Sequence, residues 1–249
     1  MLRRKKGTDN RNMKREGNGL NRRGAYDRGR RRVLTGSNLL LALIGTLLIF
    51  CAAVIIVLNL RQIYYFDIHF LNLSEEVGLD DWIIRRNYDT LIDYNLITKQ
   101  IQELRFPSFP MSESGRIHFE EVRRIFFGIQ YLGAASLVLF LLGFLRKLYR
   151  RDYGCLKIMS VLTVAIPATL GIAVALDWEQ FFVRFHQLFF RNDYWLFDPV
   201  TDPVINILPD AFFLHCAVTV LFLILLGSIL GGGLYRRLTK RYRGSLYRR

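Results

Sequence analysis

Residues Leu39–Leu60, "LLLALIGTLLIFCAAVIIVLNL", form an uninterrupted apolar run in a chain of 249 residues whose formal net charge is +14. A helix that crosses a membrane needs about 20 apolar residues, and this run reaches that length with Asn59 as its only strongly polar side chain. Three more runs of comparable length follow, so the sequence predicts an α-helical polytopic membrane protein with four transmembrane helices. We expect these helices at residues 38–60, 127–145, 156–176 and 211–235.

The basic residues are unevenly distributed among the segments outside these runs. Residues 1–32 hold 13 Lys and Arg against 3 Asp and Glu, residues 146–157 hold 5 against 1, and residues 236–249 hold 7 against none. The connections 61–126 and 177–210 together hold 10 against 17. Because Lys and Arg concentrate on the cytoplasmic side of membrane proteins, we expect both termini to be cytoplasmic and these two connections to face outward.

The cytoplasmic segments are expected to contain little tertiary structure. Residues 1–37 form a polybasic arm that cannot bury enough apolar surface to become ordered, so we expect it to be disordered. A cytoplasmic link over 146–155 and a basic tail over 236–249 complete this side. The arm and the tail are expected to attract anionic membrane lipid, and no nucleic-acid partner is expected.

The two outward connections are expected to form an extracytoplasmic cap, with residues 61–126 as its main part and residues 177–210 as a second segment. Residues 74–98 predict one or two amphipathic helices, and the stretch "RFPSFPMSESG" that follows contains two prolines that prevent regular helix. A further helix is expected from Ile117 into the second span. No cysteine lies deep in either connection, so no disulfide is expected to hold the cap together.

Two histidines are the candidates for chemistry. His118 and His186 lie close to the outer ends of the second and third spans, and an imidazole with a pKa of about 6.5 is a suitable proton carrier at neutral pH. Glu121 lies on the same helical face as His118 and could fix its tautomer. The alternatives are a solvated histidine beside a charged surface and, for His186, an interfacial histidine in an aromatic belt. His69 and His215 are expected to be structural.

Other kinds of chemistry lack their motifs. The sequence contains no Gly-x-Ser-x-Gly elbow, no glycine-rich loop for phosphate and no close His and Cys cluster for zinc. We therefore expect neither a metal nor a cofactor.

Three stretches resemble the bacterial lipoprotein intramolecular transacylase (Lit) family. They are "NYDTLIDYNL" at residues 87–96, "PSFPMSESGRIHFEEVRRIF" at residues 107–126 and "FHQLFFRNDYWLFDPVTDPVINILPDAFF" at residues 185–213. The resemblance covers roughly residues 38–235. It departs from the family pattern at Glu121, where the family has Asp three residues after its first histidine, so an orienting role for Glu121 stays open.

The resemblance implies a four-span enzyme of the bacterial cell membrane that acts on a diacylglyceryl-modified lipoprotein. The ester acyl chain at the glyceryl sn-2 oxygen would move to the free α-amine of the N-terminal cysteine, giving the lyso form, with His118 and His186 as the catalytic pair. The supporting residues that this implies are Glu121, Tyr88, Asn192, Trp195, Asp198 and Asp202. Tyr88 and Asn192 are hypothetical donors to the oxyanion, and Trp195 is a hypothetical wall of a dry pocket. Two alternatives stay open. One is a different membrane enzyme, either an acyltransferase that forms an acyl-enzyme or a lipid hydrolase, and the other is a non-catalytic membrane adaptor whose cap binds an envelope partner.

Overall fold

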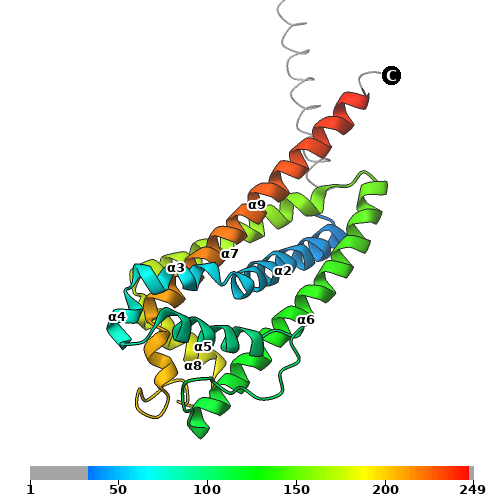
Figure 1. The fold of residues 1–249 in the computed structure, drawn as a ribbon. Coiled ribbons are helices and arrows are strands. Elements are labelled where there is room, and N and C mark those ends of the chain that lie inside the picture. The colour runs from blue at the N-terminus through cyan, green and yellow to red at the C-terminus, as the bar shows by residue number, and fades with distance from the viewer. Residues whose placement is uncertain (1–32, 247–249) are drawn as a thin grey trace, which may run out of the picture.

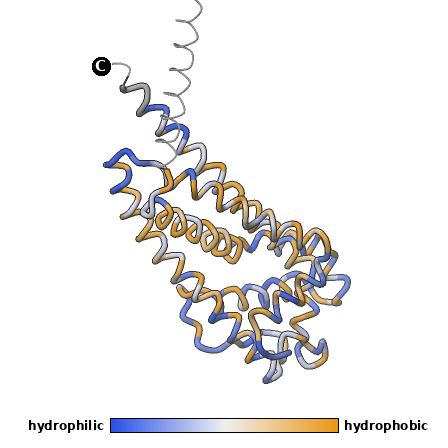
Figure 2. The backbone as a smooth tube through the Cα atoms, turned by 180° about the vertical axis from the view of Figure 1, so that it is seen from behind, coloured by the Kyte–Doolittle hydropathy of each residue, from blue (hydrophilic) through white to orange (hydrophobic). Residues whose placement is uncertain are grey.

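The computed structural model describes residues 33–246, and every regular element in that range is helical. Within it, α2 (Gly36–Asn59), α6 (Glu113–Tyr149), α7 (Gly154–Leu176) and α9 (Asp210–Leu246) contain apolar stretches long enough to cross a membrane. Figure 2 shows the hydrophobic residues concentrated along these four helices. The predicted four-helix architecture is confirmed. Residues 1–32 of the expected disordered arm lie outside the described residues.

Helix α2 is the central helix of the bundle. It packs against α6, α7 and α9 (Figure 1) and is the most deeply buried of the four. Gly45 allows this close approach, because a Cβ there would lie 2.6 Å from both Met159 Sδ and Phe140 Cε2. The run that predicts the first span is therefore also the one around which the other spans assemble.

Five short elements gather at one end of the bundle (Figure 1). They are α3 (Gln62–Phe70), α4 (Leu73–Val77), α5 (Asp81–Tyr94), α8 (Trp178–Phe189) and the 3₁₀ helix η1 (Pro203–Ile207). We call residues 61–112 and 177–209, which contain them, the cap. Residues 74–98, where one or two amphipathic helices are expected, contain α5 and most of α4.

Helix α6 connects the cap to the bundle. It begins at Glu113, slightly before the expected Ile117, because the Ser112 side chain caps its first turn by accepting a hydrogen bond from the Gly115 N–H at 3.0 Å. Its 37 residues span about 55 Å, well beyond the roughly 30 Å of a bilayer's hydrocarbon core. The first turns of α6 therefore extend past the apolar part of the helix and into the cap.

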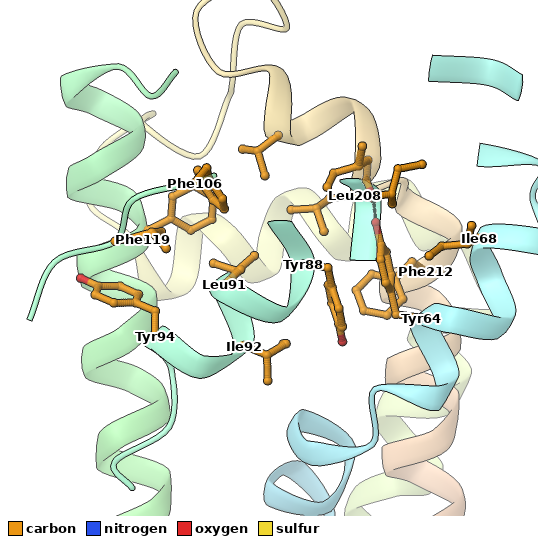
Figure 3. Packing of buried hydrophobic residues seen from close by; sticks show 14 of the residues in the cluster. Tyr64, Ile68, Tyr88, Leu91, Ile92, Tyr94, Phe106, Phe119, Leu208 and Phe212 are labelled. Carbon is orange, nitrogen blue, oxygen red and sulfur yellow. Dashed lines mark hydrogen bonds between the residues drawn. The ribbon is translucent and has the colours of Figure 1, made fainter. Parts of the chain in front are cut away.

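An aromatic core holds the cap on the bundle (Figure 3). Tyr64 of α3 stacks on Tyr88 of α5 at 3.8 Å between ring centroids, and both rings meet the edge of Phe212 in the first turn of α9. The Tyr64 hydroxyl donates to the Ile207 carbonyl at 2.5 Å. Since Leu58 of α2 and Phe212 of α9 belong to this core, the cap packs together with the adjoining ends of these two spans.

Candidate active site

His118 lies on the second turn of α6 in an apolar enclosure. Its side chain is 5% exposed, and its ring lies 4.7 Å from the Phe190 ring and 5.4 Å from the Phe197 ring between centroids. Its Nδ1 is buried and has no hydrogen-bond partner within residues 33–246. The solvated environment considered as the alternative for this histidine is therefore excluded.

His186 lies in the last turn of α8, and its tautomer is fixed by the helix backbone. Nδ1 lies 2.8 Å from the Phe182 carbonyl oxygen. A carbonyl only accepts hydrogen bonds, so Nδ1 carries the proton and Nε2 of the neutral ring keeps its lone pair. Burial lowers the pKa of His186 below its ordinary value of 6.5, although the Phe182 carbonyl and Asp210 raise it in part. The ring is therefore mainly neutral at pH 7 and can accept a proton at Nε2.

The two histidines lie next to each other although 67 residues separate them in the chain. Their ring centroids are 6.2 Å apart, with 32° between the ring planes. The Phe190 ring contacts both of them, 4.7 Å from His118 and 5.7 Å from His186. A proton acceptor and a proton donor at this separation can act on neighbouring atoms of one bound molecule.

Glu121 interacts with the segment after α8 and not with His118. Its Oε1 and Oε2 lie 3.0 Å and 3.3 Å from Asn192 Nδ2, which donates to the carboxylate. Asn192 Oδ1 in turn accepts from the Tyr194 N–H at 3.1 Å. The described part of the chain has no hydrogen bond between Glu121 and His118, so the orienting contact considered from the sequence is not made. Glu121 instead fixes the loop that carries Trp195.

Asp202 joins the second segment of the cap to the start of α6. It is 2% exposed, and it accepts hydrogen bonds from the Ser112 N–H at 2.8 Å and the Thr201 hydroxyl at 3.0 Å. A Cβ on Gly115 would overlap Asp202 Oδ1, so glycine is required there. Asp198 is exposed, and its Oδ1 accepts from the Val200 N–H at 2.8 Å. Both aspartates thus shape the loop, and neither is bonded to a histidine in residues 33–246.

Tyr88 belongs to the cap core. It is 3% exposed and packs against Tyr64 and Phe212, and burial raises the pKa of its hydroxyl. No ring contact joins it to His118 or His186 in the described structure. Its contacts are those of a packing residue of the cap core.

Trp195 stacks directly on His186, with 4.8 Å between ring centroids and 28° between planes. Its Nε1–H is buried and finds no acceptor within residues 33–246. A buried donor without a partner costs about 1–3 kcal/mol, so this N–H is available for a ligand oxygen.

The two remaining histidines, His69 and His215, lie in other environments. His215 Nδ1 lies 2.8 Å from Asp67 Oδ1 and links α9 to α3, while His69 is exposed. The sequence reasoning did not assign Phe190 and Phe197 to the enclosure of His118, and the dense aromatic composition of residues 185–197 was the only signal for them. The described residues contain no cluster of His, Cys, Asp and Glu suited to a metal ion.

The sequence profile of the family described as lipoprotein intramolecular transacylase Lit matches residues 39–213, which include both histidines. The chain belongs to the Lit family. A solved structure of the membrane-integral Lit from Bacillus cereus is 38% identical in sequence and covers 86% of this chain and 99% of its own, with a TM-score of 0.82. Since the Lit structure is membrane-integral, the chain, with its four apolar helices, is a multi-pass membrane protein.

Two further Bacillus cereus Lit structures carry a replacement of one histidine. The variant with Arg is 37% identical, with a TM-score of 0.77 over 90% of this chain and 99% of its own. The variant with Ala is 37% identical, with a TM-score of 0.76 over 88% of this chain and 99% of its own. No curated protein matches the chain.

The role of Asp202 in this Lit family member can be tested by Asp202→Ala. The substitution leaves the partly buried Ser112 N–H without its acceptor, at a cost of up to about 1–3 kcal/mol. We expect a lower thermal unfolding temperature and faster amide hydrogen exchange at residues 112–115 and 198–205. Asp193→Ala is the control, because this carboxylate is exposed and makes no side-chain hydrogen bond in the described structure. Equal exchange in the two variants would contradict the assignment.

Proposed function

We propose that the chain catalyses an acyl shift within one diacylglyceryl-modified lipoprotein. The acyl group on the glyceryl sn-2 oxygen moves to the α-amine of the N-terminal cysteine, and a lyso-form lipoprotein with an N-acyl group results. Membership of the Lit family supports the reaction class. The observation that carries the proposal is the pair of histidine rings, 6.2 Å apart, at one end of the bundle, with His118 buried and His186 partly buried.

The reaction needs no nucleophile from the protein. The amine nitrogen attacks the acyl carbon and closes a ring through the cysteine Cα, Cβ and sulfur, two glyceryl carbons and the ester oxygen. The tetrahedral centre then breaks its bond to the glyceryl oxygen, which leaves as an alcohol. Because nucleophile and electrophile belong to one molecule, the main tasks of the enzyme are to fold it into a reactive shape and to move protons.

The two histidines divide the proton transfers. His186 Nε2, whose lone pair is left free by the Phe182 contact, takes the proton from the attacking amine. The proton then passes from His186 to His118, and His118 donates it to the departing glyceryl oxygen. Both rings are neutral again at the end, so the cycle consumes no co-reactant.

The surface of α8 suits an acyl chain. Phe185, Leu188 and Phe189 are 43%, 78% and 50% exposed, which leaves an apolar surface beside His186. The Phe185 ring lies 5.6 Å from the His186 ring and 4.7 Å from the Phe189 ring. An acyl chain on this surface would place its ester close to the histidine pair.

Trp195 is the donor we assign to the developing oxyanion. Its buried and unmatched N–H belongs to the ring stacked on His186. Asn192, the donor considered from the sequence, already directs its amide to Glu121. The Trp195 N–H is therefore free to donate the hydrogen bond that the oxyanion needs.

The distribution of basic residues supports an orientation for this site. With both termini and the link at residues 146–155 in the cytoplasm, the cap lies on the outer face of the bacterial cell membrane. The histidine pair then faces the leaflet in which diacylglyceryl lipoproteins are anchored.

The reaction is tested by mass spectrometry of a lipoprotein's N-terminal peptide from cells that lack other N-acylation. We expect the chain to convert the diacylglyceryl form into an isobaric species with one amide-linked fatty acid. His118→Ala and His186→Ala should each slow conversion about 10²- to 10⁴-fold. The matched control is His69→Ala, since His69 is exposed on the cap and should be replaceable. Absence of conversion with folded protein would instead favour a non-catalytic membrane adaptor.

The pH dependence follows from the environment of His186. The substrate's α-amine has an ordinary pKa of about 8, so the rate is first divided by the fraction of unprotonated amine. Because the pKa of His186 lies below 6.5, this corrected rate should hold from pH 8 down to about 6.5 and fall only at lower pH. Asp210 raises this pKa, so Asp210→Asn should move the acidic fall in rate to still lower pH. Initial rates on a diacylated lipopeptide in vesicles measure both effects. A fall of the corrected rate that begins above pH 7, or a shift upward in the variant, would rule out His186 as the base.

Trp195→Phe separates hydrogen bonding from stacking, because Phe keeps an aromatic ring on His186 and loses only the N–H. We expect about a 100-fold lower rate with a nearly unchanged KM. Trp178→Phe is the matched control: Trp178 also has a buried N–H without an acceptor in residues 33–246, but its ring contacts Phe181 and Phe182 and neither histidine. Equal rates in wild type and Trp195→Phe would remove Trp195 from the mechanism.

A further inference from the structure

A groove of about 320 Å³ lies between α2 and α6, away from the histidine pair. Its apolar wall includes Leu40, Ile44 and Leu139. Its other end is lined by three cationic side chains, those of Arg146, Lys147 and Arg150. Apolar and cationic surfaces thus meet in one cavity.

The cationic end of the groove lies at the membrane surface opposite to the cap. Arg146 follows His118 on α6 by about 28 residues, which corresponds to about 42 Å along the helix. This distance exceeds the roughly 30 Å of a hydrocarbon core. Figure 1 shows the end of α6 and the link to α7 at the far end of the bundle from α8.

A glycine forms the floor of the groove. A Cβ on Gly143 would lie 2.7 Å from Leu41 Cδ1, so only glycine lets Leu41 close against α6. Leu41 is 5% exposed, whereas Leu40 and Leu139 on the rim are 62% and 54% exposed. The groove therefore has a closed apolar floor and a side that opens outward between two spans.

The charges at the mouth are only partly neutralised. Lys147 Nζ is held by the Ser37 hydroxyl at 2.9 Å and by Asp152 Oδ2 at 2.8 Å. Arg146 and Arg150 are exposed and have no carboxylate partner within residues 33–246. Guanidinium groups bind phosphate oxygens in a bidentate manner and with favourable charge.

We propose that this groove binds one anionic phospholipid of the leaflet opposite to the cap. The phosphate lies between Arg146 and Arg150, and one acyl chain runs along Leu40, Ile44 and Leu139. Basic pockets between transmembrane helices are suited to anionic headgroups. A free anion would use the mouth alone, whereas a lipid matches both the mouth and the apolar wall. This site is separate from the histidine pair and does not depend on the proposed reaction.

Native mass spectrometry of the full chain, titrated in detergent with dioleoyl phosphatidylglycerol, tests the site. The double variant Arg146→Gln/Arg150→Gln should bind the first lipid at least about tenfold more weakly. The matched control is Arg236→Gln/Arg237→Gln, which removes the same charge from exposed positions of α9. The adjacent residues Tyr235 and Leu238 pack against a buried cluster that includes Leu41 on the floor of the groove, so the two control positions lie at the same end of the bundle. The control should bind as the wild type does.

A second variant tests the apolar part of the site. Leu139→Trp keeps all charges and fills the groove, so it should also weaken the first binding event. The thermal unfolding temperature of each variant shows that a loss of binding is not a loss of fold. Three results would overturn the proposal: equal loss in the double variant and its control, equally tight binding of dioleoyl phosphatidylcholine, or displacement of the lipid by millimolar inorganic phosphate.

Discussion

The thickness of the hydrocarbon core is the constraint on which the whole arrangement depends. Inside it, backbone polar groups must be satisfied within each helix, so irregular loops and polar side chains are pushed to the helix ends. Helix α6 is longer than this core requires, and the excess at its start places His118 inside the cap. His186 lies in α8, the first helix after the span α7, and so it also lies just beyond the hydrocarbon core, next to His118. The lengths of the apolar segments thus place the two histidines at the same distance from the hydrocarbon core.

No disulfide holds the cap together, since all three cysteines are free. Three hydrogen bonds join its segments instead, each between residues far apart in sequence. The Tyr64 hydroxyl holds η1, Asp202 holds the start of α6, and His215 holds Asp67 of α3. Each joins a cap segment to another or to a span, so the loop that carries Trp195 is fixed from several directions. This matters for the proposed reaction, whose main requirement is a folded substrate in a dry enclosure.

The sequence predicted the parts of this structure that depend on one segment at a time. Long apolar runs give spans whatever their neighbours are, and the position of His118 and His186 at the ends of two runs, together with the family resemblance, singled out this pair. Partners across the fold were not predictable. Glu121 shares a helical face with His118, yet its carboxylate bonds Asn192, 71 residues away. Helical spacing shows which residues are neighbours on one helix and says nothing about which loop packs against that face. The packing of Tyr88 against Tyr64 and Phe212 was unpredictable for the same reason, because these rings belong to other helices.

The proposed role of His186 depends on two opposing effects on its pKa. Desolvation among aromatic rings favours the neutral imidazole of His186, and a base has to be neutral before it can accept a proton. Desolvation alone would also make the imidazolium too costly to form. The Phe182 carbonyl and the Asp210 carboxylate offset part of that cost, because both favour the protonated ring. A base of this kind is neutral at rest and still able to carry a proton for the duration of one step. In the proposed acyl shift the amine loses one proton and the alcohol gains one, so the enclosure has to tolerate only this short-lived charge. A metal or an acyl-enzyme would add a charge or a bond that the proposed reaction does not need.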